Sequence, residues 1–275
     1  MRNNSHSTKT ARLIASLALA LFASACQSVE QSPDRDAVAA MSKLGKAYFD
    51  EKCKTVAGEK IYRTVQDVES VLLLKVRPER GEAQLSDPMW PGAAFADESY
   101  DERYISDFLG YEYGRLLKEE LAPGKYRRGY ITTDKRPGGL PGYRYVDVID
   151  AKDGQRYRYT GRREEPWQYD KTYLKGYIKF FLDKTPVTTP APRYGVTFED
   201  RVIAEERAIG VASSTVKVLD LTNNEVLGEL IRYSWRPRGV RLTEWLTSSN
   251  CPHHAVGSNS ATRKFVDQVL IPKGE

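Results

Sequence analysis

The N-terminal segment constrains this chain most, because it determines which residues remain to fold and in which compartment they fold. Arg2, Lys9 and Arg12 are the only charged side chains before Glu30, and an apolar run of 13 residues follows them, from Leu13 to Ala25. As a helix this run would be roughly 20 Å long at about 1.5 Å per residue, and a bilayer core needs about 20 residues. A basic start, a short apolar run and small residues at its end are typical of a secretory signal. We therefore predict that residues 1–25 are a signal peptide.

The end of this signal, "LFASAC", resembles the lipobox of bacterial lipoproteins. In that family the signal is removed before the cysteine, which is then acylated, so the resemblance implies lipidation of Cys26. Ala23 occupies the position where the family usually has leucine, and cleavage after Ala25 followed by plain secretion is the alternative. Gln27 follows the cysteine, which by resemblance to enterobacterial lipoproteins implies the outer membrane. We expect an anchor of more than one acyl chain on the periplasmic face, since one chain binds only marginally.

Lipidation of Cys26 would leave Cys53 and Cys251 as an even pair in an oxidising compartment, which indicates a disulfide. The motif "NCPHH" around Cys251 allows two alternatives, a metal site or a catalytic thiol. His253 and His254 are neighbours and point opposite ways in an extended segment, and His6 lies in the signal. We therefore predict a Cys53–Cys251 cross-link, with no metal and no cofactor. A bridge that closes so long a loop contributes about 5 kcal/mol in the chain-entropy model.

The charge of the mature chain is small. Removal of three basic residues with the signal lowers the net charge from +5 to +2, which weakens any argument for nucleic-acid binding. Residues 26–34 are predicted to be a lipid-anchored tether and residues 35–275 a single domain. The segment "PVTTPAP" at 186–192 is typical of a linker, but the expected disulfide would span it.

The order of apolar residues predicts a β-rich α+β fold, with an N-terminal helix, an antiparallel sheet of hairpins and a short C-terminal helix. Pro33 opens a helix that ends near Cys53, and its expected buried stripe is Val38, Met41, Leu44 and Tyr48. The run 70–76 is expected inside the sheet, the acidic and proline-containing segment 78–102 is expected to be a long loop, and 103–121 is a candidate helix. Residues 261–271 are expected to form the C-terminal helix.

In three segments, apolar and polar residues alternate as they do in β-strands. Residues 143–161 predict a hairpin with Val146 and Val148 on the same face as Tyr157 and Tyr159. Residues 215–235 predict a second hairpin that turns at Asn223-Asn224. Residues 172–184 predict a strand with an inner face of Leu174, Ile178, Phe180 and Leu182.

Recognisable catalytic motifs are missing from the sequence. It has no phosphate-binding glycine loop, no HExxH and no nucleophile elbow. The fragments "STVK" (214–217) and "SSN" (248–250) imitate serine penicillin-binding enzymes, but "STVKVLDL" alternates as a strand and no KTG follows. Two distant carboxylates can still converge in a glycosidase site, so an enzyme is not favoured and remains open.

One surface has a distinctive composition. Residues 125–163 contain 11 basic and four acidic side chains interleaved with tyrosines. The candidate anion- or polymer-binding face predicted from this pattern consists of Arg156, Arg158, Tyr173, Lys175, Tyr177 and Lys179. The alternative is that the acidic segment 78–102 folds over this face and neutralises it.

Two stretches of the chain are similar to exported proteobacterial proteins of unknown function, namely "EKCKTVAGEKIYRTVQDVESVLLLKVRP" and "VLDLTNNEVLGE". The resemblance implies export and one domain, and no site residues. The first hypothesis is a non-catalytic, lipid-anchored envelope protein of binding or assembly, whose partner is an envelope polymer or another envelope protein. The alternatives are a polysaccharide or peptidoglycan hydrolase, favoured by a cleft with two convergent carboxylates, and an inhibitor or immunity-type lipoprotein, favoured by a flat apolar patch.

Overall fold

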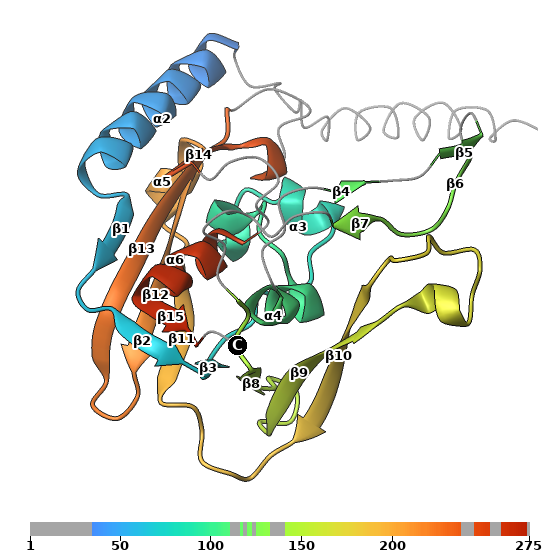
Figure 1. Cartoon of the computed structure of the whole chain (residues 1–275). Helices are drawn as coiled ribbons and strands as arrows, with labels where there is room; N and C mark the ends of the chain where they lie inside the picture. The colour runs from blue at the N-terminus through green and yellow to red at the C-terminus, as the bar shows by residue number, and fades with distance from the viewer. Residues whose placement is uncertain are drawn as a thin grey trace, which may run out of the picture. The chain divides into compact units, whose positions relative to one another are not determined.

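The largest element of the molecule is a mixed sheet of nine strands in the order β1-β13-β12-β11-β3-β8-β9-β10, with β14 also paired to β13 (Figure 1). The computed structural model describes residues 35–110, 116–117, 120–122, 125–132, 141–237, 245–253 and 260–273. The predicted signal peptide, Cys26 and the tether lie outside these ranges. The sheet and the helices packed on it confirm the predicted β-rich α+β class.

The strands of the large sheet are β1 (Gly58–Ile61), β3 (Ser70–Leu73), β8 (Tyr145–Ile149), β9 (Arg156–Glu164), β10 (Lys179–Pro186), β11 (Tyr194–Arg201), β12 (Val211–Asp220), β13 (Glu225–Trp235) and β14 (Ser249–Cys251). The helical elements are α2 (Arg35–Thr55), α3 (Glu82–Ser86), η1 (Pro91–Phe95), α4 (Asp101–Leu109), η2 (Pro166–Gln168), α5 (Ala204–Ala208), η3 (Trp245–Thr247) and α6 (Ala261–Val269). Short pairs are formed by β2 (Val65–Val68) with β15 (Leu270–Pro272), β4 (Leu116–Leu117) with β7 (Ile131–Thr132), and β5 (Glu120–Ala122) with β6 (Lys125–Tyr126).

Strand β3 lies at the centre of the sheet and confirms the expectation for the apolar run 70–76. It pairs parallel with both β11 and β8, whereas the other pairings of the large sheet are antiparallel. Val71 and Leu73 are fully buried and Leu72 is 4% exposed, so both faces of this strand are covered. A continuous apolar run suits such a position. The predicted purely antiparallel sheet therefore needs this one correction.

Both predicted hairpins are confirmed. In β8–β9, Val146 faces Tyr159 and Val148 faces Tyr157, as the alternation required. In β12–β13, Asp220 pairs with Glu225, and the turn between them holds Asn224 at φ +58°. Asparagine tolerates this left-handed conformation better than most residues.

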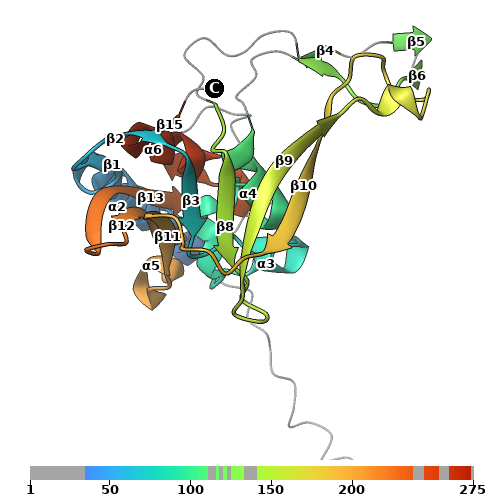
Figure 2. The ribbon, with the colours of Figure 1, turned by 60° about the horizontal axis from the view of Figure 1, so that its bottom comes forward.

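The predicted strand over 172–184 begins only at Lys179. Gly176 adopts φ +84°, which interrupts an extended chain, and the residues before Lys179 form turns. Ile178 is 52% exposed, so its assignment to an inner face is wrong, whereas Leu174, Phe180 and Leu182 are buried or half-buried. Beyond Tyr159, strand β9 pairs with β10 alone, and this hairpin extends past the end of β8 (Figure 2).

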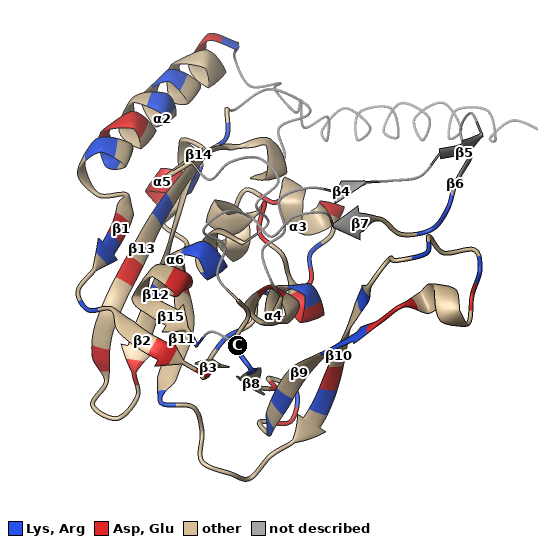
Figure 3. Cartoon of the chain, viewed as in Figure 1, with Lys and Arg blue, Asp and Glu red and all other residues tan. Residues whose placement is uncertain are grey.

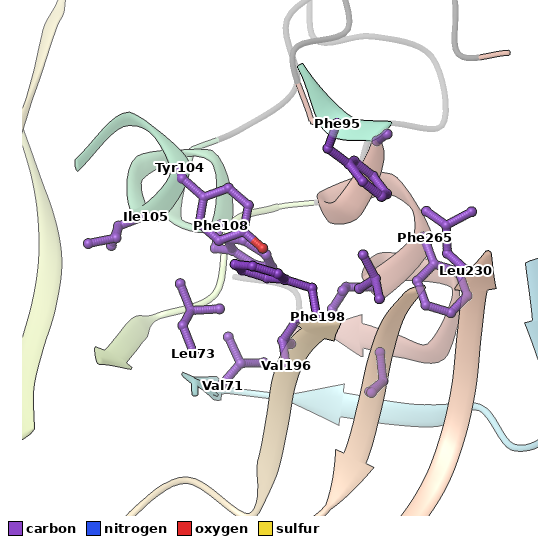
Figure 4. Close-up of a cluster of buried hydrophobic side chains, with 14 of the residues drawn as sticks. Val71, Leu73, Phe95, Tyr104, Ile105, Phe108, Val196, Phe198, Leu230 and Phe265 are labelled. Carbon is purple, nitrogen blue, oxygen red and sulfur yellow. The ribbon is translucent and has the colours of Figure 1, made fainter. Parts of the chain in front are cut away.

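The main core lies between the sheet and a layer made of η1, α4 and α6 (Figure 4). Phe95, Tyr104, Phe108 and Phe265 from this layer are at most 1% exposed and pack over Val196 of the sheet. The prediction of a long loop over 78–102 is therefore wrong, because η1 within it buries Ala93, Ala94 and Phe95. The candidate helix 103–121 is confirmed only in its first part, as α4, which ends at Leu109 before Gly110. Its last part is wrong, because Leu116–Leu117 and Glu120–Ala122 are the strands β4 and β5.

Helix α2 covers the opposite face of β12 and β13, where Phe49 packs with Val211, Ile231 and Tyr233. The predicted stripe is wrong in two positions, since Met41 is 43% and Leu44 is 57% exposed. Gly45 and Phe49 are the buried positions instead. A Cβ atom at Gly45 would overlap the backbone carbonyl of Ile209, so glycine permits the close approach that turns this face toward the sheet.

The predicted disulfide is confirmed. Cys53, near the end of α2, is bonded to Cys251 in β14, with a Cα–Cα distance of 5.7 Å and a sequence separation of 198. Cys251 therefore has a structural partner, and His253 beside it is exposed. The predicted C-terminal helix is α6, which buries Phe265, Val266 and Val269 as expected.

Candidate functional site

Two members of the predicted binding face are engaged within the fold. Arg158 donates from Nε and Nη2 to the two carboxylate oxygens of Asp147 at 2.8 and 3.1 Å, and Nε of Arg156 lies 3.4 Å from the same carboxylate. Asp147 is fully buried and belongs to the adjacent strand β8. Because one buried carboxylate holds both guanidinium groups, these arginines support the hairpin and are poorly placed to bind a polymer.

The predicted acidic cover does not reach these arginines. Within segment 78–102, Asp97 forms an ion pair with Arg232 at 2.7 Å. Glu98 accepts hydrogen bonds from the backbone nitrogen and hydroxyl of Thr262 at 2.9 and 2.6 Å. These acids serve the core layer of η1 and α6, whereas Asp147 neutralises Arg156 and Arg158.

Tyr173 and Tyr177 lie instead in the loop 165–178 that joins β9 to β10. Their rings stack with centroids 5.8 Å apart and an interplanar angle of 10°, and Tyr130 lies 5.3 Å from Tyr177. The guanidinium of Arg128 is 4.1 Å from the Tyr173 ring. Burial, with Tyr130 and Tyr173 nearby, raises the pKa of Tyr177.

The same loop places two lysines over an indole. The ammonium groups of Lys171 and Lys175 lie 3.4 and 5.0 Å from the Trp167 ring centre. Carboxylates hold the loop in shape: Glu165 accepts from the backbone of Gly176 at 2.6 Å, which lowers the pKa of Glu165. We call this surface the aromatic tip, and its residues are Arg128, Tyr130, Trp167, Lys171, Tyr173, Lys175 and Tyr177.

Lys179, the last member of the predicted face, starts β10 on another side of the hairpin. Its ammonium lies 4.5 Å from the Phe181 ring, and the guanidinium of Arg162 lies 5.1 Å from the same ring. Basic and acidic residues both occur along this hairpin (Figure 3). The predicted face is therefore divided by the structure into the pair on Asp147, the tip and this outer cluster.

A cavity of about 580 Å³ lies beside the part of the same hairpin that is close to its loop, where Arg163 pairs with Phe180. Arg163 and Phe180 are directly paired across β9 and β10, and both line it. The Phe180 ring lies across Gly161, where a Cβ atom would overlap it. We call this the basic cavity, and its lining residues are Glu69, Leu109, Pro141, Gly142, Tyr143, Arg144, Gly161, Arg163, Phe180 and Lys273.

The basic cavity has an excess of positive charge. Arg144, Arg163 and Lys273 face a single carboxylate, Glu69, which pairs with Lys273 at 3.1 Å. The hydrogen bond from Lys273, with the nearby charge of Arg144, lowers the pKa of Glu69. Neither arginine side chain forms a hydrogen bond or ion pair with any residue that the structure describes. Two exposed guanidinium groups are thus available to carboxylate or phosphate, which Arg binds in a bidentate manner.

Among the described residues that line the basic cavity there is one carboxylate, Glu69, whereas a glycosidase needs two in one cleft. Two acids of the core layer, buried Glu98 and half-buried Asp107, do not line the cavity. Within the described ranges, no group of three His, Cys, Asp or Glu residues is placed to hold a metal ion, and no helix is long and apolar enough to cross a membrane.

Comparisons with protein-family models, with curated proteins and with solved structures found no match to this chain. The site is therefore interpreted from its geometry alone.

The sequence contained a partial signal for the basic cavity. Arg144 shares parity with Val146 and Val148, and Arg163 shares parity with Tyr157 and Tyr159, so each arginine lies on the core-facing side of its strand. An arginine on the core-facing side of a strand is typical of a position where the hydrophobic core ends. Nothing in the local pattern indicates Glu69 or Lys273, because these residues reach the cavity from segments more than 200 positions apart.

Proposed function

We propose that this chain is a non-catalytic, lipid-anchored protein of the bacterial cell envelope that binds an anionic envelope polymer along the β9–β10 hairpin. The excess of cations in the basic cavity, where Arg144 and Arg163 lack ion-pair partners among the described residues, is the observation that carries the proposal. The loop 165–178, which carries most of the aromatic tip, begins two positions after Arg163, the residue that pairs with Phe180. A polymer in the cavity would therefore continue onto aromatic rings that carry cations.

The recognition chemistry favours a polymer with carboxylates or phosphates spaced along sugar rings. Guanidinium groups pair with these anions, and the half-buried rings of Tyr173, Tyr177 and Trp167, whose faces are packed against each other or against cations, offer their exposed edges to the sugar rings between them. The lipid anchor at Cys26 and the location at the outer membrane rest on the lipobox. They fit a role in which the domain holds a polymer close to the membrane.

The binding proposal is tested by co-sedimentation of the full mature chain with isolated peptidoglycan sacculi. We expect the double variant Arg144→Gln, Arg163→Gln to bind about ten-fold more weakly, which corresponds to about 1.4 kcal/mol. Arg162→Gln, Lys179→Gln is the matched control, because it also removes two positive charges, on the opposite side of the hairpin from Arg163. A similar loss in the control, or no retention of the unaltered protein, would show that the cavity is not the binding site.

The anchor is tested separately by the intact mass of the protein purified from its native host. A chain that begins at Cys26 and carries diacylglyceryl or triacyl mass is expected. An unlipidated chain that begins at the same residue would support plain secretion instead.

A further inference from the structure

Strand β10 forms one edge of the large sheet. Within the described ranges it pairs with β9 and with no other strand (Figure 1). Residues 160–164 of β9 pair with residues 179–183 of β10 beyond the last pair of β9 with β8, so this part of the hairpin has only two strands. Edge strands in native proteins are usually short or blunted, and a two-stranded ribbon has little stability of its own. A long edge strand in this position, eight residues in length, therefore indicates a further pairing partner.

The backbone of β10 presents free hydrogen-bonding groups along this edge. The amide of Val187 donates to the carbonyl of Arg156, next to the start of β9, at 3.0 Å. In an antiparallel pair, the backbone groups of successive residues point alternately toward the partner strand and away from it. The amide and carbonyl groups of Phe180, Leu182 and Lys184 therefore point away from β9, and no residue that the structure describes bonds to them.

The side chains on the outer face of this edge are Lys179, Phe181 and Asp183, all partly exposed. The ammonium of Lys179 lies 4.5 Å from the centre of the Phe181 ring and forms no ion pair with the described residues. The carboxylate of Asp183 lies 3.4 Å from Nε of Arg162, a guanidinium that also pairs with Glu164. The edge thus carries a cation, an aromatic ring and an anion at intervals of two residues.

We infer that β10 pairs with the same strand of a second copy of this chain, antiparallel and about a two-fold axis at Phe181. Such a pairing forms hydrogen bonds between residues whose backbone groups point outward, and Phe180 opposite Leu182 of the second copy meets this condition on both sides of the axis. The same register places Lys179 opposite Asp183 of the second copy and Phe181 opposite its own counterpart. Opposite charges and paired aromatic rings both stabilise such cross-strand pairs.

The neighbouring positions of the axis fit less well. An axis at Leu182 would place Phe181 opposite Asp183, and an axis at Asp183 would place two carboxylates opposite each other, which is destabilising. An axis at Phe180 would leave Asp183 without an opposite residue in β10. Charge complementarity therefore selects Phe181. The alternative is that Lys179 and Asp183 protect the edge from pairing, as charged residues do in many sheets, and this alternative predicts a monomer.

The inference is tested by sedimentation equilibrium of the full mature chain over a range of protein concentrations, with Cys26→Ser to remove the anchor. A monomer–dimer equilibrium is expected. Phe181→Glu is expected to raise the dissociation constant by about ten-fold or more, because two carboxylates would meet at the axis. Within one copy the new carboxylate lies beside Lys179 and Arg162, which favours the fold. Tyr169→Glu is the matched control, since it replaces an exposed ring in the loop of the same hairpin, and it should leave the dissociation constant unchanged.

The register is tested by oxidation of two single variants in the same chain. Opposite residues at a position without hydrogen bonds have Cα atoms about 4.5 Å apart, which a disulfide can bridge. Phe181→Cys is therefore expected to form a covalent dimer. Asp183→Cys is expected to stay monomeric under oxidation, because its counterpart would lie four residues along the second strand, about 13 Å away.

Three results would overturn the inference. A monomer at every concentration would show that the charges protect the edge. A dimer that Phe181→Glu does not weaken would place the interface elsewhere on the molecule. A covalent dimer of Asp183→Cys without one of Phe181→Cys would contradict the axis. These measurements contain no polymer, so their outcome is independent of the proposed function.

Discussion

Individual charged side chains lie unusually deep in this protein. Arg77, Arg207, Arg232 and Arg263 are each at most 4% exposed. They are held by carboxylates, backbone oxygens or aromatic rings: Arg232 pairs with Asp97, and Arg263 pairs with Asp267 at 2.6 Å. Arginine stays charged on burial and stacks on aromatic faces, so removal of one partner would leave an uncompensated charge.

Asp107 is the clearest titrating group at the residue scale. Burial raises its pKa from the ordinary 3.8 to about 7, with the charge of Glu98 adding to the increase, whereas the neighbouring Ser99 and the charges of Arg103 and Arg263 oppose it. Below about pH 4 the carboxyl is protonated in both folded and unfolded chains. Between about pH 4 and 7 only the folded chain keeps the proton, so stability falls as the pH rises through this window.

Asp107→Asn is expected to remove this pH dependence. Above pH 7 the variant should be more stable than the unaltered protein by up to about 4 kcal/mol, the free energy that corresponds to the difference between a pKa of 3.8 and one of about 7. Urea unfolding at pH 5 and pH 8 measures it. Glu102→Gln, exposed on the same helix, serves as the control. Equal pH profiles for Asp107→Asn and the unaltered protein would show that Asp107 ionises freely in the fold.

At the scale of elements, the packing of α2 depends on one glycine. Gly45 brings the helix backbone against the carbonyl of Ile209, and this contact turns Phe49 toward β12 and β13. The pattern of large apolar residues alone favours Met41 and Leu44, which are exposed. A glycine in a helix is destabilising by itself, so its presence here is explained by tertiary packing.

Gly45→Ala is expected to destabilise the protein by up to about 2 kcal/mol. Alanine improves helix propensity by about 1 kcal/mol, but the new methyl group forces the helix away from the sheet, and overpacking costs about 1–3 kcal/mol. Urea unfolding measures the change, and Lys43→Ala on the exposed side of α2 is the control, expected within about 0.5 kcal/mol. A Gly45→Ala variant that is more stable than the unaltered protein would contradict the close contact.

At the scale of the whole molecule, the disulfide joins segments separated by 198 positions. It links the end of α2 to β14. Strands β14 and β1 both pair with β13. The bridge therefore closes most of the described chain into one loop and ties the helix to one edge of β13.

The double variant Cys53→Ser, Cys251→Ser is expected to lose about 3–5 kcal/mol of stability, because the unfolded chain gains the entropy that the bridge removed. Urea unfolding of the unaltered protein with and without reductant measures the same quantity independently. The double variant should not respond to reductant. A reductant-insensitive unaltered protein would mean that these cysteines are not paired in solution.

The sequence by itself determined the features that depend on local alternation or on residue type. The hairpins β8–β9 and β12–β13, the helix α6 and the Cys53–Cys251 pair were all predictable, because strand facing repeats every two residues and a cysteine pair has few alternatives. The sequence also indicated that Arg144 and Arg163 lie on the core-facing sides of their strands, but it did not indicate that the two arginines line one cavity.

Only the tertiary structure decided which distant segments meet. The parallel position of β3 between β11 and β8, the buried face of α2 and the folding of η1 into the core all depend on packing between remote elements. The basic cavity arises in this way, because it joins Glu69, Arg163 and Lys273. The local alternation of apolar and polar residues determines the direction in which a side chain points. Which distant residues it contacts depends on the free energy of packing the whole core.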